Sequence, residues 1–130
     1  MAPRLGIEPF ASEGTPGAWM VRWRVTNLGA RPVRLLAATQ PHAQFRTDEI
    51  KVPRDVRPGG ETEISLPVRF DETPGSVIEN PFLILRFADE EGEWRALARV
   101  RVTAGPGGRP IAGPLVVVTS HRVGGIGSWS

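Results

Sequence analysis

Apolar and polar residues alternate strictly in the first long apolar segment of the chain. The side chains of Trp19, Val21, Trp23 and Val25 would point to one side of an extended chain, and the residues between them to the other. A period of two is typical of a β-strand with one face in a hydrophobic core and one in water. The segment therefore predicts such a strand, and Asn27 opens a turn signal after it.

The same alternation returns twice further along the chain, in residues 61–70 and 94–103. The run of residues 82–87 is almost continuously apolar, which predicts a central strand that is buried on both faces or flanked by the tail. Pro67 lacks an N–H donor, which favours an edge strand or a bulge. Further short strands are expected in residues 5–10, 33–40 and 41–57, and turns in residues 11–17, 58–60 and 89–92.

The chain changes character after Thr103. Residues 104–110 are rich in Gly and Pro and predict a flexible linker, and residues 115–119 form an apolar, β-prone run. Such a run would promote aggregation if exposed, so we expect it to add a strand to an edge of this domain or of a partner. The predicted organisation is one domain in residues 1–103, with a linker and a tail strand in 104–130.

Composition supports an all-β chain. Its 13 Pro and 15 Gly leave no window for a long helix, and no stretch shows the apolar spacing of an amphipathic helix. The net charge of +2 is small for a dedicated nucleic-acid binder. The absence of Cys excludes disulfides, thiolate metal sites and thiol catalysis. With no apolar signal region or membrane-length run, we expect a cytoplasmic protein without membrane contact.

Two short motifs carry a resemblance. Val25-Thr26-Asn27-Leu28-Gly29 precedes the second hairpin, and Arg57-Pro58-Gly59-Gly60-Glu61 precedes an alternating strand. This order is similar to that of bacterial immunoglobulin-like β-sandwich modules, including the adhesion-related type, and covers residues 5–103. The resemblance implies an immunoglobulin-like antiparallel β-sandwich of about seven strands, with the tail strand added. It implies a spacer or interaction module and no shared catalytic residues.

Candidate catalytic and metal sites are sparse. In a sandwich the turns at 27–32, 58–60 and 89–92 share one end, and those at 11–17, 39–44 and 71–81 share the other. The acidic turn Asp89–Glu93 matches no calcium loop, so we expect a solvated turn that faces Arg31 and Arg57. His42 lies near three acidic residues, but a single histidine is not a set of metal ligands, so the sequence gives little support for a metal site there. We expect no cofactor, no metal and no enzymatic activity.

Four Trp raise a carbohydrate-binding alternative, because exposed indoles stack on sugar rings. Trp19, Trp23 and Trp94 occupy inward positions of their predicted strands, which favours core packing. Only Trp129 is expected to be exposed. The sequence therefore favours a core role for the other three.

Outward arginines mark the candidate interaction surface. Arg22 and Arg24 would be neutralised by Glu61 and Glu63 if their strands are neighbours. The arginines of the last sandwich strand have fewer obvious partners, so that strand can meet an acidic partner. The candidate residues are Arg95, Arg99, Arg101, Leu115, Val117 and His121.

The predicted function is that of a non-catalytic binding or scaffold module that acts through protein–protein contacts. Its expected mechanism is edge-strand pairing, in which residues 115–119 supply or complete a strand and Arg99 and Arg101 orient the partner. The partner would be another protein or a second copy of this chain. Two alternatives stay open: a carbohydrate-binding module that uses exposed Trp, and a weak nucleic-acid or anion binder that uses the arginine face.

Overall fold

Nine β-strands make up the fold of the computed structural model, which describes residues 3–123, with residues 114–117 described in backbone only. A short 3₁₀ turn (Pro106–Gly108) joins the last two strands. No helix in this part of the chain has the length and apolar character needed to cross a membrane. The strands are β1 (Leu5–Thr15), β2 (Ala18–Asn27), β3 (Val33–His42), β4 (Phe45–Val56), β5 (Glu61–Val68), β6 (Val77–Ile78), β7 (Phe82–Asp89), β8 (Gly92–Ala104) and β9 (Pro110–Arg122).

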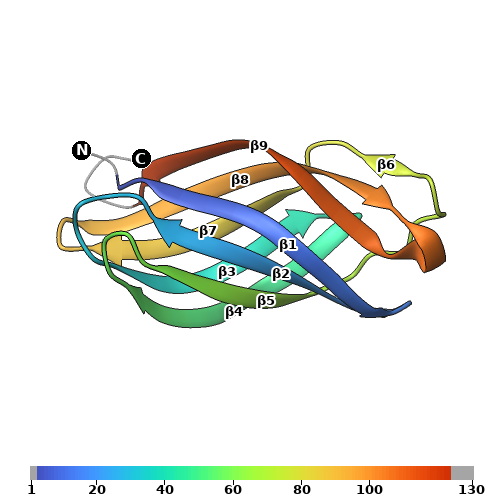
Figure 1. Ribbon diagram of the computed structural model, residues 1–130, viewed down its shortest axis with the longest axis horizontal. Helices are drawn as coiled ribbons and strands as arrows, with labels where there is room; N and C mark the ends of the chain where they lie inside the picture. Colours follow the sequence, from blue (N-terminus) through green and yellow to red (C-terminus); the bar gives the residue numbers. More distant parts are fainter. Residues whose placement is uncertain (1–2, 124–130) are drawn as a thin grey trace.

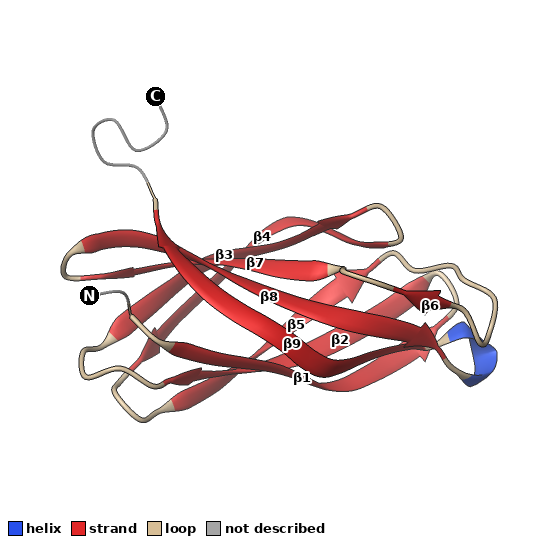
Figure 2. Ribbon diagram, turned by 90° about the horizontal axis from the view of Figure 1, so that it is seen from above, coloured by secondary structure: helices blue, strands red, loops and turns tan. Residues whose placement is uncertain are grey.

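The strands form two antiparallel sheets that pack face to face (Figures 1 and 2). The smaller sheet has the order β1-β2-β5. The larger has the order β4-β3-β7-β8, with β6 and β9 also paired to β8. The larger sheet curls, so that β9 at its edge lies beside β1 of the smaller sheet (Figure 1).

The core consists of the residues that alternate along the strands. Trp19, Trp23 and Trp94 are 5%, 0% and 6% exposed, which confirms their predicted inward positions. The apolar residues of β5, which include Ile64 and Leu66, are buried in the same core, and most of the polar residues between them are exposed. Removing a buried aromatic side chain typically costs about 3–5 kcal/mol, so these side chains dominate the stability of the sandwich. The all-β prediction is confirmed.

The sequence underestimated the length and the number of the strands. Residues 11–15, expected in a turn, continue β1 beyond a bulge between Pro9 and Ala11, and the actual turn is only Pro16-Gly17. The third strand, expected to end before Pro41, continues to His42. Residues 45–56, where one or two short strands were expected, form one long strand, with register shifts where β3 and β4 pair. Each bulge interrupts the period of two, which hides the strand from pattern analysis.

β7 is central, as predicted, because it lies between β3 and β8. It is not buried on both faces. Leu83, Leu85 and Phe87 are buried in the core, whereas Phe82 and Ile84 are only half-buried on the opposite face. The continuous apolar run therefore marks a sheet face that carries apolar side chains toward solvent.

Asn27 explains the motif that begins the second hairpin. Its side chain is fully buried, and its Nδ2 donates to the carbonyls of Arg31 (2.8 Å) and Val56 (3.0 Å). Its Oδ1 accepts from the Gly29 amide (2.9 Å). Its backbone bonds to the turn at residues 57–60, where Gly59 has a φ of 76°, a conformation that favours glycine. Hydrogen bonds between the two motifs thus hold the β2–β3 loop against the β4–β5 loop.

The Gly- and Pro-rich segment before β9 is a compact turn. The Gly105 amide donates to the Arg109 carbonyl (2.8 Å), and the Gly108 amide to the Gly105 carbonyl (2.9 Å). β9 then pairs with β8 from Pro110 to Arg122, within the same chain. Ala112 and Val118 of β9 pack against the core. The expected flexible linker is therefore a tight connection between two paired strands (Figure 2).

Candidate functional site

The outward side chains of β7, β8 and β9 form a surface that we name the β7–β9 face. The strand register arranges them in three rows across the sheet. At the centre, Ile84, Leu97 and Thr119 lie opposite one another. The other two rows are Phe82–Arg99 on one side, where the backbone of Val117 lies opposite Arg99, and Arg86–Arg95–His121 on the other.

The row Arg86–Arg95–His121 places two arginines, Arg86 and Arg95, directly opposite each other. Arg86 pairs with Glu93 through Nε (3.0 Å) and Nη2 (3.3 Å), and with Glu49 (3.5 Å). The hydrogen bonds that Arg86 donates to the Glu93 carboxylate raise the pKa of Arg86. Arg95 lies between Arg86 and His121 and is exposed. Like charges at facing positions destabilise a sheet, so this row has a cost to the free protein.

A hollow of about 320 Å³ opens on the same face. The half-buried side chains of Phe82 and Leu97 contribute its apolar walls, and Arg99, Thr119 and His121 line the rest. The His121 ring nitrogen Nε2 lies 3.2 Å from the Thr119 hydroxyl. The hollow can therefore accept an apolar group, with a guanidinium beside it.

Among the residues that the structure describes, eight arginines form ion pairs and seven do not, and of these seven only Arg95 and Arg99 lie on β8; the other five are Arg4, Arg54, Arg57, Arg109 and Arg122. The guanidinium groups of Arg95 and Arg99 are on exposed residues of the β7–β9 face. A cationic side chain without a carboxylate partner can bind an anionic group of a ligand. These two arginines are the cationic part of the candidate site.

The remaining predicted residues, Arg101, Leu115 and Val117, are not among the described side chains that form this site. Arg101 makes a two-pronged ion pair with Glu79, with Nε–Oε1 at 2.7 Å and Nη2–Oε2 at 3.1 Å, so its charge is already matched. In backbone, Leu115 lies opposite Val100 and Val117 opposite Arg99; their side chains lie outside the described part of the chain. The structure thus brings together Arg95, Arg99 and His121.

The arginines of β2 have partners other than those expected. Glu63 does lie opposite Arg24 in the register. The ion pairs, however, join Arg24 to Glu8 (3.3 Å) and Arg22 to Glu13 (3.5 Å), both on β1. The ring of Phe10 also lies 4.7 Å from the Arg24 guanidinium carbon. The expectation that the two strands are neighbours, with Glu63 facing Arg24, is confirmed, whereas Glu61 lies opposite Thr26 and the ion pairs form with carboxylates of β1.

The acidic turn at residues 89–92 faces Arg31, as predicted. The Arg31 guanidinium approaches Glu90 (3.0 Å), Glu91 (3.2 Å) and Asp89 (3.8 Å). Burial opposes ionisation of the Asp89 side chain, which is 1% exposed, but hydrogen bonds from the Trp94 indole and the Glu91 amide, with the charge of Arg31, lower its pKa. These three acidic side chains therefore interact with Arg31 within the protein and support the folded turn.

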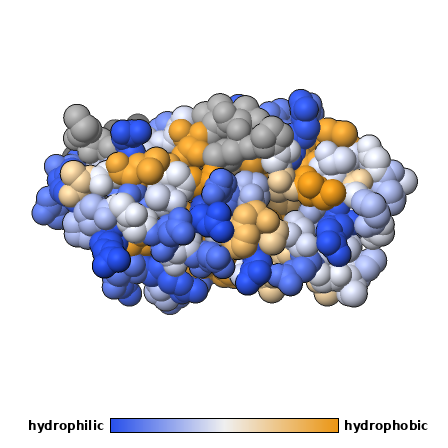
Figure 3. Space-filling view, viewed as in Figure 1, coloured by the Kyte–Doolittle hydropathy of each residue, from blue (hydrophilic) through white to orange (hydrophobic). Residues whose placement is uncertain are grey.

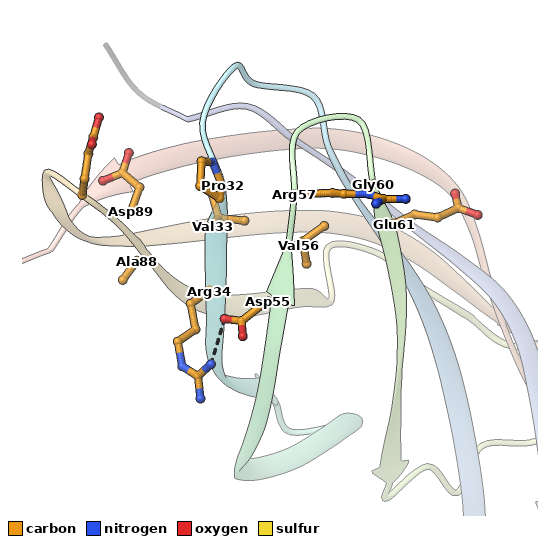
Figure 4. A pocket seen from close by; sticks show the side chains of 11 residues that line it. Pro32, Val33, Arg34, Asp55, Val56, Arg57, Gly60, Glu61, Ala88 and Asp89 are labelled. Carbon is orange, nitrogen blue, oxygen red and sulfur yellow. Dashed lines mark hydrogen bonds and ion pairs between the residues drawn. The ribbon is translucent and has the colours of Figure 1, made fainter.

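A second hollow, of about 690 Å³, lies beside this turn (Figure 4). Arg34 and Asp55 on its rim pair with each other at 2.8 Å. Arg57, expected to face the acids, lines the same hollow, and no ion pair joins it to them within the described residues. Most charged groups of this lining are already paired, Arg34 with Asp55 and both Asp89 and Glu90 with Arg31, so they are not free to bind a ligand.

The opposite end of the sandwich holds His42. Its Nδ1 accepts from the Gln44 amide (3.1 Å), and the Gln44 side chain donates to Glu72 (3.2 Å). Within residues 3–123, no group of three or more His, Cys, Asp or Glu side chains is placed to hold a metal ion. The described residues give His42 a role in its own turn.

Pattern analysis missed the apolar part of the site. Phe82, Ile84 and Leu97 were assigned to the core or passed over, because an apolar residue at an outward position does not stand out within an apolar run. The available signal was the loss of alternation in residues 82–87. A single-faced strand should show polar residues there.

Comparisons with known proteins assign no family. No family model matches the chain, and no curated protein matches it. Among solved structures, the chain is similar to the X-ray structure of Northeast Structural Genomics Consortium target SoR45. The match covers 95% of this chain and 87% of that chain, with 10% sequence identity and a TM-score of 0.25.

Proposed function

We propose that this protein is a non-catalytic binding module that docks a partner protein on the β7–β9 face. One observation carries the proposal: Arg95 and Arg99, which have no carboxylate partner among the described residues, flank the half-buried Leu97 on one strand. Protein interfaces combine an apolar centre with arginine anchors.

A sugar ligand is less well supported. Sugar binding through stacking needs exposed aromatic rings, and Trp19, Trp23 and Trp94 are buried. Trp129 lies outside the described residues. The described part of the chain therefore presents no indole platform.

A nucleic-acid ligand is also less well supported. Neutralising a phosphate backbone needs several cations along a track. On this face Arg86 is paired with Glu93, and Arg101 with Glu79. Among the described residues of β8, only Arg95 and Arg99 are then available to contact phosphates. The apolar hollow between them suits a protein side chain better.

Edge-strand pairing stays a prediction with a narrower scope. The β-prone run of residues 115–119 is paired with β8 in this chain, so one edge of β9 is occupied. The other edge lies beside β1, and the described residues show no ladder between β1 and β9. We therefore propose the β7–β9 face as the main docking surface, and the edge of β9 that lies beside β1 as the place for any added strand.

We also propose that the fold is a variant of the immunoglobulin-like sandwich. The pairing of β2 with β5, and of β3 with β7 and then β8, separates the strands between two sheets as in Greek-key sandwiches. β9 would then be an addition to the last strand of that core. This assignment explains why consecutive strands β2 and β3 lie in different sheets.

Selection from an unbiased displayed peptide library tests the function. Peptides enriched on the native protein should bind a control variant, Arg54→Glu with Arg109→Glu, and lose binding to Arg95→Glu with Arg99→Glu. The control changes the same charge at exposed arginines of β4 and the β8–β9 turn. The proposal fails if no peptide is enriched, or if the selected peptides bind both variants equally.

A further inference from the structure

We infer that the partner presents an extended acidic segment, in which one bulky apolar side chain lies between two carboxylates at alternate positions. This inference rests on the proposed docking function of the β7–β9 face and specifies the chemistry of the occupant. It comes from the outward row of β8, where Arg95, Leu97 and Arg99 occupy successive outward positions.

The spacing of this row matches an extended chain. Residues at positions i, i+2 and i+4 of a strand point to the same side, and four residues span about 13 Å. A partner segment lying along β8 would repeat this spacing. Its carboxylates would reach Arg95 and Arg99, and the side chain between them would enter the hollow beside Leu97 and Phe82.

The charges of the surroundings favour carboxylates over other groups. Arg95 lies between Arg86 and His121, and only Arg86 has carboxylate partners, Glu93 and Glu49. A carboxylate brought to Arg95 would relieve the repulsion in this row. Arg99 stands beside the apolar wall of Phe82, where a charge-assisted hydrogen bond is less exposed to competing water.

Fluorescein-labelled synthetic peptides test this inference by fluorescence anisotropy. The test peptide is Gly-Ser-Glu-Ser-Trp-Ser-Glu-Ser-Gly, and its matched control has Gln for both Glu. A second control places both Glu directly beside Trp, which keeps composition and charge but moves the carboxylates to the opposite side of an extended chain. The test peptide should bind at least about tenfold more tightly than either control.

A charge swap separates recognition from folding. The variant Arg95→Glu with Arg99→Glu should lose the Glu peptide and gain affinity for the same peptide with Lys in place of Glu, a gain that a misfolded variant cannot produce. The control variant Arg54→Glu with Arg109→Glu should keep the native preference.

The outcomes distinguish this inference from the proposed function. Equal binding of the Glu and Gln peptides, abolished in the Arg95→Glu, Arg99→Glu variant, would overturn the acidic chemistry and leave protein docking intact. Equal binding of the two Glu spacings would overturn the extended geometry. Displacement of the peptide by an equimolar single-stranded oligonucleotide would reassign the face to phosphate binding. Absence of binding by all peptides would also overturn the inference, and the library selection then decides the docking function.

Discussion

Single polar residues decide how the loops of this sandwich are held. The side chain of Asn27 uses both its NH₂ group and its carbonyl oxygen inside the protein, in three hydrogen bonds that join the β2–β3 loop to the end of β4. Asp89 does the same for the β7–β8 turn, where its Oδ1 accepts from the Trp94 indole and the Glu91 amide. Both residues follow apolar strands, so sequence analysis took them only as turn signals.

Replacing Asn27 should destabilise the protein strongly. The change Asn27→Ala leaves the Val56 carbonyl in a buried place without its donor and removes the acceptor of the Gly29 amide. We expect a loss of about 2–4 kcal/mol in the free energy of unfolding, measured by urea denaturation. The neighbouring change Leu28→Ala, at a residue that is 51% exposed, should cost less than about 0.5 kcal/mol. Equal losses of stability at the two positions would contradict a stabilising role for the hydrogen bonds of the Asn27 side chain.

Asp89 should make stability depend on acid pH. The pKa of this carboxyl is lowered in the folded state, so its charge stabilises the fold above the ordinary aspartate range near pH 4. This contribution is lost as the pH falls through the lowered pKa, because the proton then binds the folded protein as well. Asp89→Asn should be less stable than the native protein at pH 7, and the difference should shrink toward pH 2. A difference that is constant with pH would refute this.

At the scale of the element, the pattern of the sequence predicted strands well where they are regular and poorly where they bulge. β2, β5 and β8 keep one buried and one exposed face throughout, and their alternation predicted both strand and core. β1 and β4 contain register shifts, which no period of two can reveal. Figure 3 shows the predominantly hydrophilic surface that results over much of the side viewed.

The candidate site follows the same division. Arg95 and Arg99 could be identified because they occupy outward positions of a regular strand. The partner of Arg101 could not, since Glu79 follows the two-residue strand β6, whose place beside β8 depends on the tertiary fold. The hollow likewise arises from three strands brought together by register. Local sequence carries no information about such neighbours.

β9 should be required for a monomeric sandwich. Deleting residues 110–130 removes the strand paired with β8 from Trp94 to Ala104 and uncovers the core contacts of Ala112 and Val118. An exposed strand edge promotes association. We expect light scattering to show aggregation or a larger mass than the full chain. A truncated protein that keeps the association state and the melting temperature of the full chain would contradict a structural role for β9.

At the scale of the whole molecule, the arginines fall into two groups. Most of those with ion pairs connect neighbouring strands or loops, as Arg31, Arg34 and Arg86 do. Arg95 and Arg99 are two of the seven arginines without such a partner among the described residues, and Arg95 also lies opposite another arginine, Arg86, where like charge costs stability. Proteins commonly retain such costly groups where binding requires them.

Thermal unfolding of Arg95→Glu tests this account most directly, because it needs no partner. The new carboxylate would lie opposite Arg86 and replace the repulsion between two arginines with attraction. We expect the free protein to gain about 0.2–1 kcal/mol in stability, seen as a melting temperature about 1–4 °C higher at pH 7. A lower melting temperature would show that Arg95 supports the fold, and it would contradict the claim that this face is kept for a ligand.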